Sequence, residues 1–408
     1  MRQSRRAEKG IGSSEARGNG WRATVSGCCA SLVGIGLARF AYTPLLPAII
    51  GAHWFAPSAA AYLGAANLAG YLAGALMGRP MAAKIALPVL LRGLMLLATA
   101  AFFACSAPLS PIWFFVWRLL SGISGGALMV LAAPTVLPHV PPQRRGVASG
   151  AIFAGVGLGI AASGTLVPLL LRQGLALTWC GLGALSLVLT IVAWTGWPTE
   201  HPRPATKHVH HIHTLQPTVR LRALYLQYGL NAVGLVPHML FLVDYVARGL
   251  GEGLDSGAQY WVLFGIGAVL GPVLSGHLAD RTGFGPALRL AFFIEAVCVT
   301  LPALGTGTLG LLISSFVIGA FTPGIVPLAL GRVRELLPHD PTDQTAAWSA
   351  ATTAFALFQA AAAYGLTFAF TRSDGDYHLI FLIGAIAFIA SLGIDLIVGV
   401  SVSRRRVA

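Results

Sequence analysis

The amino-acid sequence predicts an all-α polytopic membrane protein with twelve transmembrane helices, arranged as two parallel-repeat six-helix bundles. Composition is the first reason: 56% of the 408 residues are hydrophobic and 10% are charged, more apolar surface than a soluble protein of this length can cover. The second reason is a series of twelve apolar segments, each long enough to cross a bilayer core of about 30 Å. The third reason is an internal repeat that relates the first six segments to the last six.

Each segment is expected to be a helix, because the segments are continuously apolar and do not alternate in polarity as barrel strands do. The spans of the first bundle are predicted at 23–50, 60–82, 87–107, 111–137, 146–171 and 175–197. Those of the second bundle are predicted at 222–246, 257–279, 286–305, 309–331, 346–371 and 378–400. The predicted domains are a basic tail at 1–22, an N-terminal bundle at 23–197, a linker at 198–221, a C-terminal bundle at 222–400 and a basic tail at 401–408.

The distribution of Lys and Arg predicts the orientation. Of the 27 basic residues, 22 lie in the two tails, the linker and the loops on the same side as these, and only 3 lie in loops on the other side. The remaining two, Arg39 and Arg118, lie within spans. Because basic loops stay in the cytoplasm, both termini are expected to be cytoplasmic, which also requires an even number of spans.

The basic charge does not indicate a nucleic-acid partner. The formal charge of +13 is spread between apolar segments, whereas nucleic-acid binders gather Lys and Arg into one patch of a folded surface. The linker contains five histidines, and it can be read either as a metal-binding cluster or as a solvated tether. We favour the tether, and we expect no metal and no cofactor. The linker histidines are His201, His208, His210, His211 and His213.

Matching loop sequences carry the internal repeat. Residues 137–141 read LPHVP and residues 337–341 read LPHDP, 200 positions later. Gly78 in the second span is likewise matched by Gly276 in the eighth span. Two bundles of the same orientation, joined by a cytoplasmic linker, commonly hold a substrate site near the membrane midplane between them.

Residues 276–283, GHLADRTG, resemble the loop motif of the major facilitator superfamily at the expected place between spans eight and nine. The first half keeps Gly78 of this motif but has alanine at the Asp and Arg positions. Residues 36–47 and 62–71 are similar to the first two spans of the YbfB/YjiJ group of bacterial transporters. The resemblance implies a monomeric secondary transporter in the bacterial inner membrane, with a small molecule as its substrate. It also implies that the motif residues Gly276, Asp280, Arg281 and Gly283 help to gate the cytoplasmic side.

Two basic residues within spans are candidates for the site. Arg39 lies beyond the middle of the membrane in span one, and an Arg at that depth is expected to face the bundle interior. Arg118 lies nearer a span end, where a snorkelling position is the alternative. The chain has no Asp or Glu between Glu15 and Glu200. The counter-charge must therefore come from the second half, with Asp244 as the candidate, from helix carbonyls or water, or from an anionic substrate.

Polar residues in span seven and elsewhere are candidates for the cavity lining. In span seven, Gln227, Asn231 and His238 share one helical face, and Pro237 predicts a break in the helix. His238 could carry protons or be a satisfied interior histidine. The further lining candidates are Tyr42, Asn67, Tyr71 and Gln359. The resemblance places Glu295 and Asp395 on peripheral helices, where we expect packing or interfacial roles.

The function that we predict is alternating-access transport of a small organic solute, with an anionic substrate and H⁺ as the coupling ion both left open. A membrane enzyme is the first alternative, but the sequence has no H-E-x-x-H, no phosphate-binding P-loop and no paired carboxylates inside its spans. A transport-inactive sensor or scaffold is the second alternative.

Overall fold

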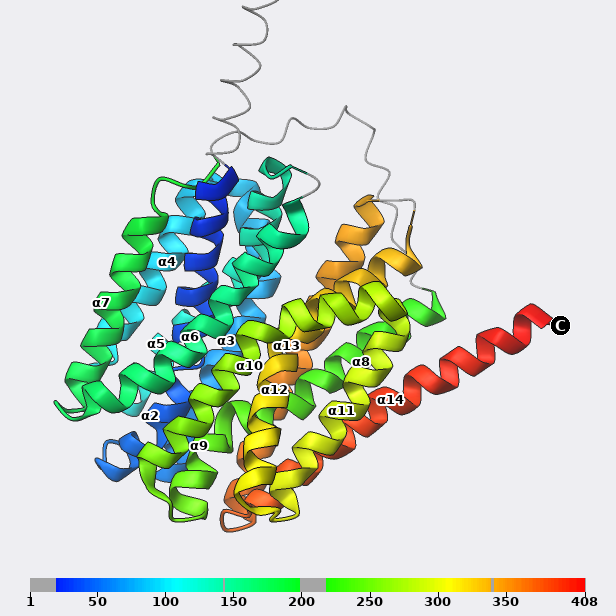
Figure 1. Ribbon diagram of the computed structural model, residues 1–408. Coiled ribbons are helices and arrows are strands. Elements are labelled where there is room, and N and C mark those ends of the chain that lie inside the picture. The colour runs from blue at the N-terminus through cyan, green and yellow to red at the C-terminus, as the bar shows by residue number, and fades with distance from the viewer. Residues whose placement is uncertain (1–19, 142–143, 199–217, 339–340, 408) are drawn as a thin grey trace, which may run out of the picture.

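The computed structural model describes residues 20–141, 144–198, 218–338 and 341–407 (Figure 1). All regular elements in these residues are helical, and twelve helical segments are long and apolar enough to cross a membrane. The predicted fold class is therefore confirmed. The histidines of the linker, from His201 to His213, lie outside the described residues.

The two bundles lie side by side, the first at the left of Figure 1 and the second at the right. Span one covers Gly20–Gly51 and is followed by α3 (Pro57–Lys84), α4 (Leu87–Ala104), α5 (Pro111–Val136), α6 (Arg145–Leu171) and α7 (Leu175–Ala193). Span seven covers Val219–Gly249 and begins with α8 (Val219–Val236); it is followed by α10 (Gly253–Thr282), α11 (Phe284–Ala303), α12 (Gly307–Leu336), α13 (Pro341–Arg372) and α14 (Tyr377–Val407). The end of the molecule where span one begins and α7 ends, at the top of Figure 1, is called the linker end below.

The helix ends differ most from the predicted spans. Helix α13 begins at Pro341, five residues before the predicted span, and α14 continues to Val407, beyond the predicted end at 400. Hydropathy marks only the part of a helix that lipid covers, and a helix can continue into water past that part. The hydrophobic pattern therefore predicts that these helices exist, and it underestimates their length.

Each bundle contains a helix pair whose backbones approach closely at glycines. In the first bundle, a Cβ atom at Gly70 of α3 would lie 2.0 Å from the Leu119 carbonyl oxygen of α5. In the second, a Cβ atom at Gly271 of α10 would lie 1.7 Å from the Ala320 carbonyl oxygen of α12. Helices in lipid associate through such contacts between small residues, because lipid offers no hydrophobic drive toward burial. Both bundles therefore pack a corresponding pair of helices in the same way, as the internal sequence repeat leads one to expect.

The two bundles contact each other mainly through α6 with α10 and α3 with α13. At the first contact the Trp261 indole N–H donates to the Ser163 hydroxyl over 3.0 Å, and a Cβ atom at Gly157 would lie 2.5 Å from the Val269 backbone nitrogen. At the second contact the rings of Tyr62 and Tyr364 lie 6.1 Å apart.

Spans one and seven are both discontinuous. Span one passes from a π-helical turn, η1 (Leu32–Leu37), through a non-helical turn at 38–41 into α2 (Tyr42–Gly51). Span seven passes from α8 into η4 (Pro237–Phe241), α9 (Leu242–Asp244) and η5 (Tyr245–Gly249). The break at Pro237 is the predicted one, because proline has no N–H for the helical hydrogen bond. The hydropathy pattern does not predict the break in span one, which lies just before Pro44.

Candidate functional site

The break in span one exposes the Ala38 carbonyl, and Arg118 binds it. The Arg118 Nη1 donates to the Ala38 oxygen over 2.7 Å, and Asn67 and Ser121 approach the same oxygen at 3.5 and 3.4 Å. Arg118 is only 3% exposed, so it does not snorkel to the membrane surface. A backbone carbonyl thus supplies the negative partner that the first half lacks among its side chains.

Tyr42 completes the surroundings of Arg118. The Arg118 guanidinium carbon lies 4.4 Å from the centre of the Tyr42 ring, and the Tyr42 hydroxyl donates to the Ala60 carbonyl over 2.7 Å. Asn67 also donates to the Arg118 carbonyl over 3.3 Å. These three cavity candidates therefore lie together, but they join α2, α3 and α5 of one bundle to the broken turn of span one. They do not line the cavity between the bundles.

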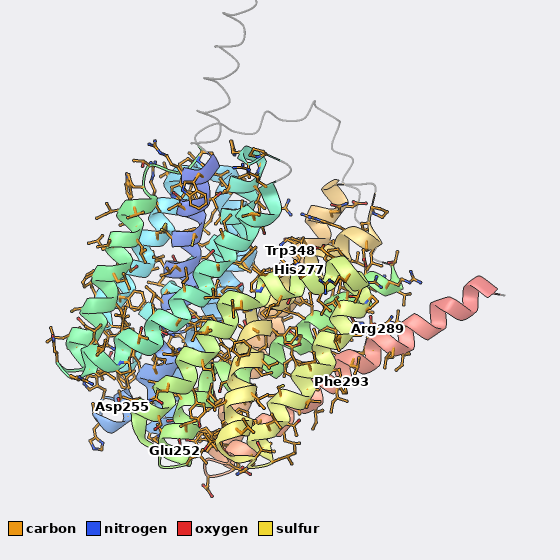
Figure 2. The ribbon with its side chains drawn as sticks, viewed as in Figure 1. Glu252, Asp255, His277, Arg289, Phe293 and Trp348 are labelled. Atoms are coloured by element: carbon orange, nitrogen blue, oxygen red, sulfur yellow. The ribbon has the colours of Figure 1, made fainter. Side chains whose placement is uncertain are left out.

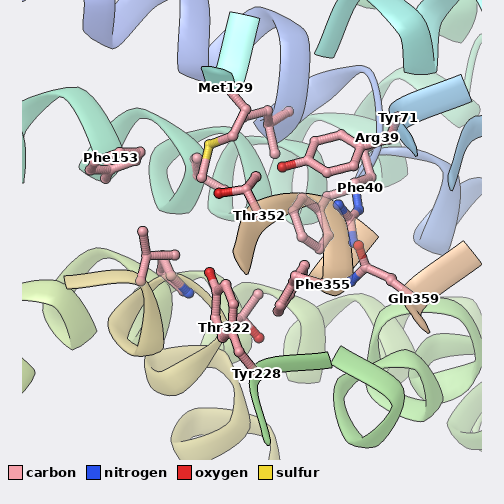
Figure 3. A pocket seen from close by; sticks show the side chains of 14 residues that line it. Arg39, Phe40, Tyr71, Met129, Phe153, Tyr228, Thr322, Thr352, Phe355 and Gln359 are labelled. Atoms are coloured by element: carbon pink, nitrogen blue, oxygen red, sulfur yellow. The ribbon is translucent and has the colours of Figure 1, made fainter. Parts of the chain in front are cut away.

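That cavity lies between the two bundles and is mostly apolar (Figure 3). It offers about 50 Å³ to the centres of water molecules, several times the roughly 10–15 Å³ that one water needs. The first bundle lines it with Ile35, Arg39, Phe40, Tyr71, Met129, Phe153 and Val156, and the second with Tyr228, Thr322, Pro323, Val326, Thr352, Phe355 and Gln359.

Arg39 is the only charged residue among the described residues that line the cavity. Its guanidinium carbon lies 5.1 Å from the ring centres of both Phe40 and Tyr71. Its Nη2 lies 3.6 Å from the Met239 sulfur, which also receives the Gln359 amide at 3.5 Å. Figure 3 shows Arg39 and Gln359 next to each other at one end of the cavity.

The hydrogen bonds of this pair are incomplete. The buried Nε of Arg39 and the buried Oε1 of Gln359 have no partner among the described residues. A positively charged hydrogen-bond donor, Arg39, and an amide oxygen acceptor, Gln359, are thus both available at the same end of the cavity. An anionic group on the substrate, one of the three counter-charges considered for Arg39, fits this geometry because a carboxylate can accept from a guanidinium at two nitrogens.

Asp244 is not the partner of Arg39 in this conformation. Its carboxylate oxygens accept from Arg248, both over 2.5 Å, and the Tyr377 hydroxyl donates to the same carboxylate over 2.7 Å. Asp244 and Arg248 are four residues apart on one helical turn, so local spacing already satisfies the carboxylate. Asp244 is buried at the end of the molecule opposite to the linker end. Within the described part of the chain, Arg39 has no carboxylate partner.

The polar face of span seven points into the second bundle and away from the cavity. Gln227 donates to Asp395 over 3.3 Å, Asn231 donates to Glu295 over 2.8 Å, and the His238 Nε2 lies 2.7 Å from the Ser314 hydroxyl. The three residues share one helical face as predicted, but their hydrogen-bond partners lie on α14, α11 and α12 of the same bundle. Asn231 and His238, which we expected in the lining, therefore lie in the bundle core, and Tyr228 faces the cavity instead.

The loop motif at 276–283 lies at the linker end of α10. Gly283 has a φ of +82° at the C-terminus of the helix, a conformation that glycine adopts most readily, and this allows the tight turn into α11. Gly276 has open space where a Cβ atom would stand, and Asp280 and Arg281 are exposed. Beside the turn, Glu335 of α12 accepts from the Phe284 backbone N–H over 3.0 Å, so the turn is tied to α12.

Sequence reasoning missed most of the aromatic residues that line the cavity. Thr352, Phe355 and Gln359 of α13 follow each other at helical spacing and line one side of the cavity. That spacing places the three residues on one face of α13, but the other faces of this helix are equally apolar, so the sequence does not show which face lines the cavity. Glu295 of α11 is 0% exposed, so its side chain lies inside the second bundle.

Comparison with known proteins agrees with the motifs. The family described as "Uncharacterised MFS-type transporter YbfB" matches residues 31–396. A gallate transporter of Pseudomonas putida is 24% identical over 298 residues, which are 64% of this chain and 65%, just under two thirds, of that protein. The inner membrane transport protein YdhP of Escherichia coli (strain K12) is 26% identical over 323 residues, 76% of this chain and 79% of that protein.

Solved structures share the fold. A D-xylose-proton symporter superimposes with a TM-score of 0.74 at 17% identity, over 92% of this chain and 97% of that chain. A nucleoside transporter, NupG, superimposes with a TM-score of 0.72 at 13% identity, over 92% of this chain and 99% of that chain. The family match covers nearly the whole chain and confirms the predicted resemblance. This multi-pass membrane protein therefore belongs to the YbfB-type family of the major facilitator superfamily, a family of transporters and not of enzymes.

Proposed function

We propose that this protein is a secondary active transporter that moves a small aromatic carboxylate by alternating access, with Arg39 as the residue that binds the carboxylate. The observation that carries this proposal is that, among the residues that the structure describes, Arg39 is the single charge in the cavity lining and has no carboxylate partner. An unpaired cation in a mostly apolar cavity favours an anion strongly, because the low dielectric strengthens their attraction.

The rings of the cavity support an aromatic solute. Phe40, Tyr71 and Phe355 lie around the Arg39 end, and Tyr228 and Phe153 extend the apolar surface. Aromatic rings pack well edge-to-face and offset against a planar ligand. The hydroxyls of Thr322 and Thr352 could bind polar ring substituents. The similarity to a gallate transporter is in keeping with this substrate class, since gallate is a trihydroxybenzoate.

Proton coupling is the second part of the proposal. Moving one negative charge into a cell that is negative inside costs about 2.3 kcal/mol per 100 mV. Carrying one proton with each anion removes this cost, because the pair is neutral. We therefore propose import of the anion with H⁺, with both termini and the linker in the cytoplasm as the basic loops indicate.

Flux in sealed proteoliposomes tests the proposal. With an inward proton gradient, purified protein is expected to accumulate radiolabelled gallate, and benzoate is expected to compete. Xylose, a neutral sugar, serves as the control solute and is expected not to compete. Accumulation that is independent of the proton gradient would contradict the coupling. No flux of gallate or benzoate would contradict the substrate class and favour the sensor or scaffold alternative.

A gating role for the loop motif is also part of the proposal. Asp280→Asn is expected to reduce gallate flux several-fold while the amount of folded protein in the membrane stays unchanged, because it removes the charge available for contacts that close the linker end. Asp255→Asn is the matched control. Asp255 is an exposed carboxylate at the other end of α10, where Figure 2 shows it far from His277 of the motif. Equal flux from the two variants would remove the motif from the gating mechanism.

A further inference from the structure

Glu295 lies in the core of the second bundle and has no cationic partner among the residues that the structure describes. It lies in the middle of α11 and is 0% exposed. One carboxyl oxygen, Oε2, accepts from the Asn231 amide over 2.8 Å. The other oxygen, Oε1, has no partner among the described residues.

The charged and titratable groups around α11 are bound elsewhere or lie along the helix. Arg289, six residues earlier and about 9 Å along the axis, forms an ion pair with Asp395 of α14. Toward the linker end of α12, Arg332 pairs with Glu335. His238 of η4 is bound to Ser314. Other titratable groups on the neighbouring elements include Cys298 one turn along α11 and His378 of α14. On α8 they are Arg220, Arg222, Tyr225 and Tyr228, on α10 Asp255, Tyr260, His277, Asp280 and Arg281, on α12 Arg334 and on α14 Tyr377.

An ionised carboxylate in this position would be expensive. Burial of a charge without a partner costs so much that the group takes up a proton instead. A neutral carboxyl group needs a single acceptor for its O–H. Asn231 can supply this acceptor, because its amide oxygen also has no partner among the described residues, and a half-turn of the amide presents oxygen in place of nitrogen.

Asn231 connects Glu295 to the moving parts of the site. It lies one helical turn after Tyr228, which lines the cavity, and six residues before Pro237, where α8 ends. Beyond this break the Met239 carbonyl accepts from the Thr43 hydroxyl of the first bundle. A change in the charge of Glu295 therefore acts on the discontinuous span that both lines the cavity and contacts the other bundle.

We infer that Glu295, with Asn231 as its hydrogen-bond partner, is the proton-binding site of this transporter. Proton uptake forms an O–H bond on the carboxylate, and release breaks that bond and passes the proton to water, with no change in oxidation state. The protonated form is the one that this conformation holds. The link between this proton and solute movement rests on the proposed function, whereas the protonated state of Glu295 does not.

Infrared spectroscopy of the purified protein tests the site without any substrate. Wild-type protein near neutral pH is expected to show the C=O stretch of a buried, protonated carboxylic acid. Glu295→Gln is expected to lose this band, and it should fold because Gln has nearly the shape of the neutral acid and can keep the bond to Asn231. Glu252→Gln changes an exposed carboxylate and is expected to keep the band. Absence of the band in wild type, or its persistence in Glu295→Gln, would overturn the inference.

Transport of gallate tests the coupling. In Glu295→Gln, the accumulation of gallate driven by a proton gradient is expected to fall roughly tenfold or more. The exchange of labelled for unlabelled gallate, measured with equal gallate concentrations inside and outside the vesicles, is expected to continue. Exchange does not require position 295 to release a proton, so the permanently neutral Gln side chain is expected to support it. Unchanged gradient-driven accumulation in the variant would overturn the coupling role. If wild-type vesicles do not move gallate, the proposed substrate fails, and the infrared result still decides whether Glu295 holds a proton.

Discussion

Arg39→Gln is expected to weaken gallate binding by about 10- to 100-fold. A hydrogen bond to a charged group contributes about 1.5–3 kcal/mol, and Gln keeps polarity without the charge or the forked geometry. Arg39→Lys is expected to lose less, because it keeps the charge and loses only the two-nitrogen contact. The measurement is isothermal titration calorimetry of gallate on the detergent-purified protein, with thermal shift as a second readout.

The control for Arg39 is another arginine that stacks on a ring. The Arg92 guanidinium lies 5.2 Å from the centre of the Trp194 ring, outside the cavity, so Arg92→Gln is expected to leave gallate affinity unchanged. Asp244→Asn is also expected to bind gallate nearly normally, because Arg248 and Tyr377, not Arg39, hold that carboxylate.

Parental affinity in Arg39→Gln would remove Arg39 from the binding site. Recovery of affinity by reversing the charges of Arg39 and Asp244 would favour the ion pair over the substrate contact.

Gly122→Leu is expected to prevent the first bundle from folding. A Cβ atom at Gly122 of α5 would lie 2.0 Å from the Asn67 carbonyl oxygen of α3, and backbone atoms cannot move aside as a side chain can. Overpacking commonly costs about 1–3 kcal/mol even where side chains can rearrange, and here two helices would have to separate. A cost of about 3 kcal/mol lowers the ratio of folded to unfolded protein roughly 100-fold.

The measurement for Gly122 is the monodisperse peak of the solubilised protein in fluorescence-detected size-exclusion chromatography. Gly93→Leu in α4 is the matched control, since nothing lies within 4 Å of a Cβ atom at Gly93, and the peak is expected to stay. A normal peak for Gly122→Leu would mean that the contact between α3 and α5 is looser than the structure has it.

Hydropathy and motifs were sufficient to predict the fold from the sequence. The apolar segments are long and uninterrupted, and lipid forces every backbone polar group in them to be bonded within the segment, which leaves the helix as the solution. The repeated loop sequences identified two equivalent halves. Pro237 predicted the break in span seven because its missing N–H is a local property. The superfamily motif at 276–283 then specified the family.

Which residues line the site depends on how each helix is oriented about its own axis, and a single sequence does not specify this orientation. Arg39 and Arg118 look alike as isolated charges in apolar spans, yet Arg39 lines the cavity and Arg118 binds a carbonyl exposed by the break in its neighbour. Asn231 and Glu295 likewise meet in the bundle core although their helices are far apart in the chain.

The physical reason lies in the solvent of this protein. In water, a helix shows its buried face as an apolar stripe, but in lipid both faces are apolar, so hydropathy does not distinguish the face toward lipid from the face toward protein. Rotation and contacts are set by close packing at positions such as Gly70, Gly122 and Gly271. The sequence by itself therefore determined which segments span the membrane, and only the tertiary structure decided that Arg39 faces the cavity and that Glu295 faces Asn231.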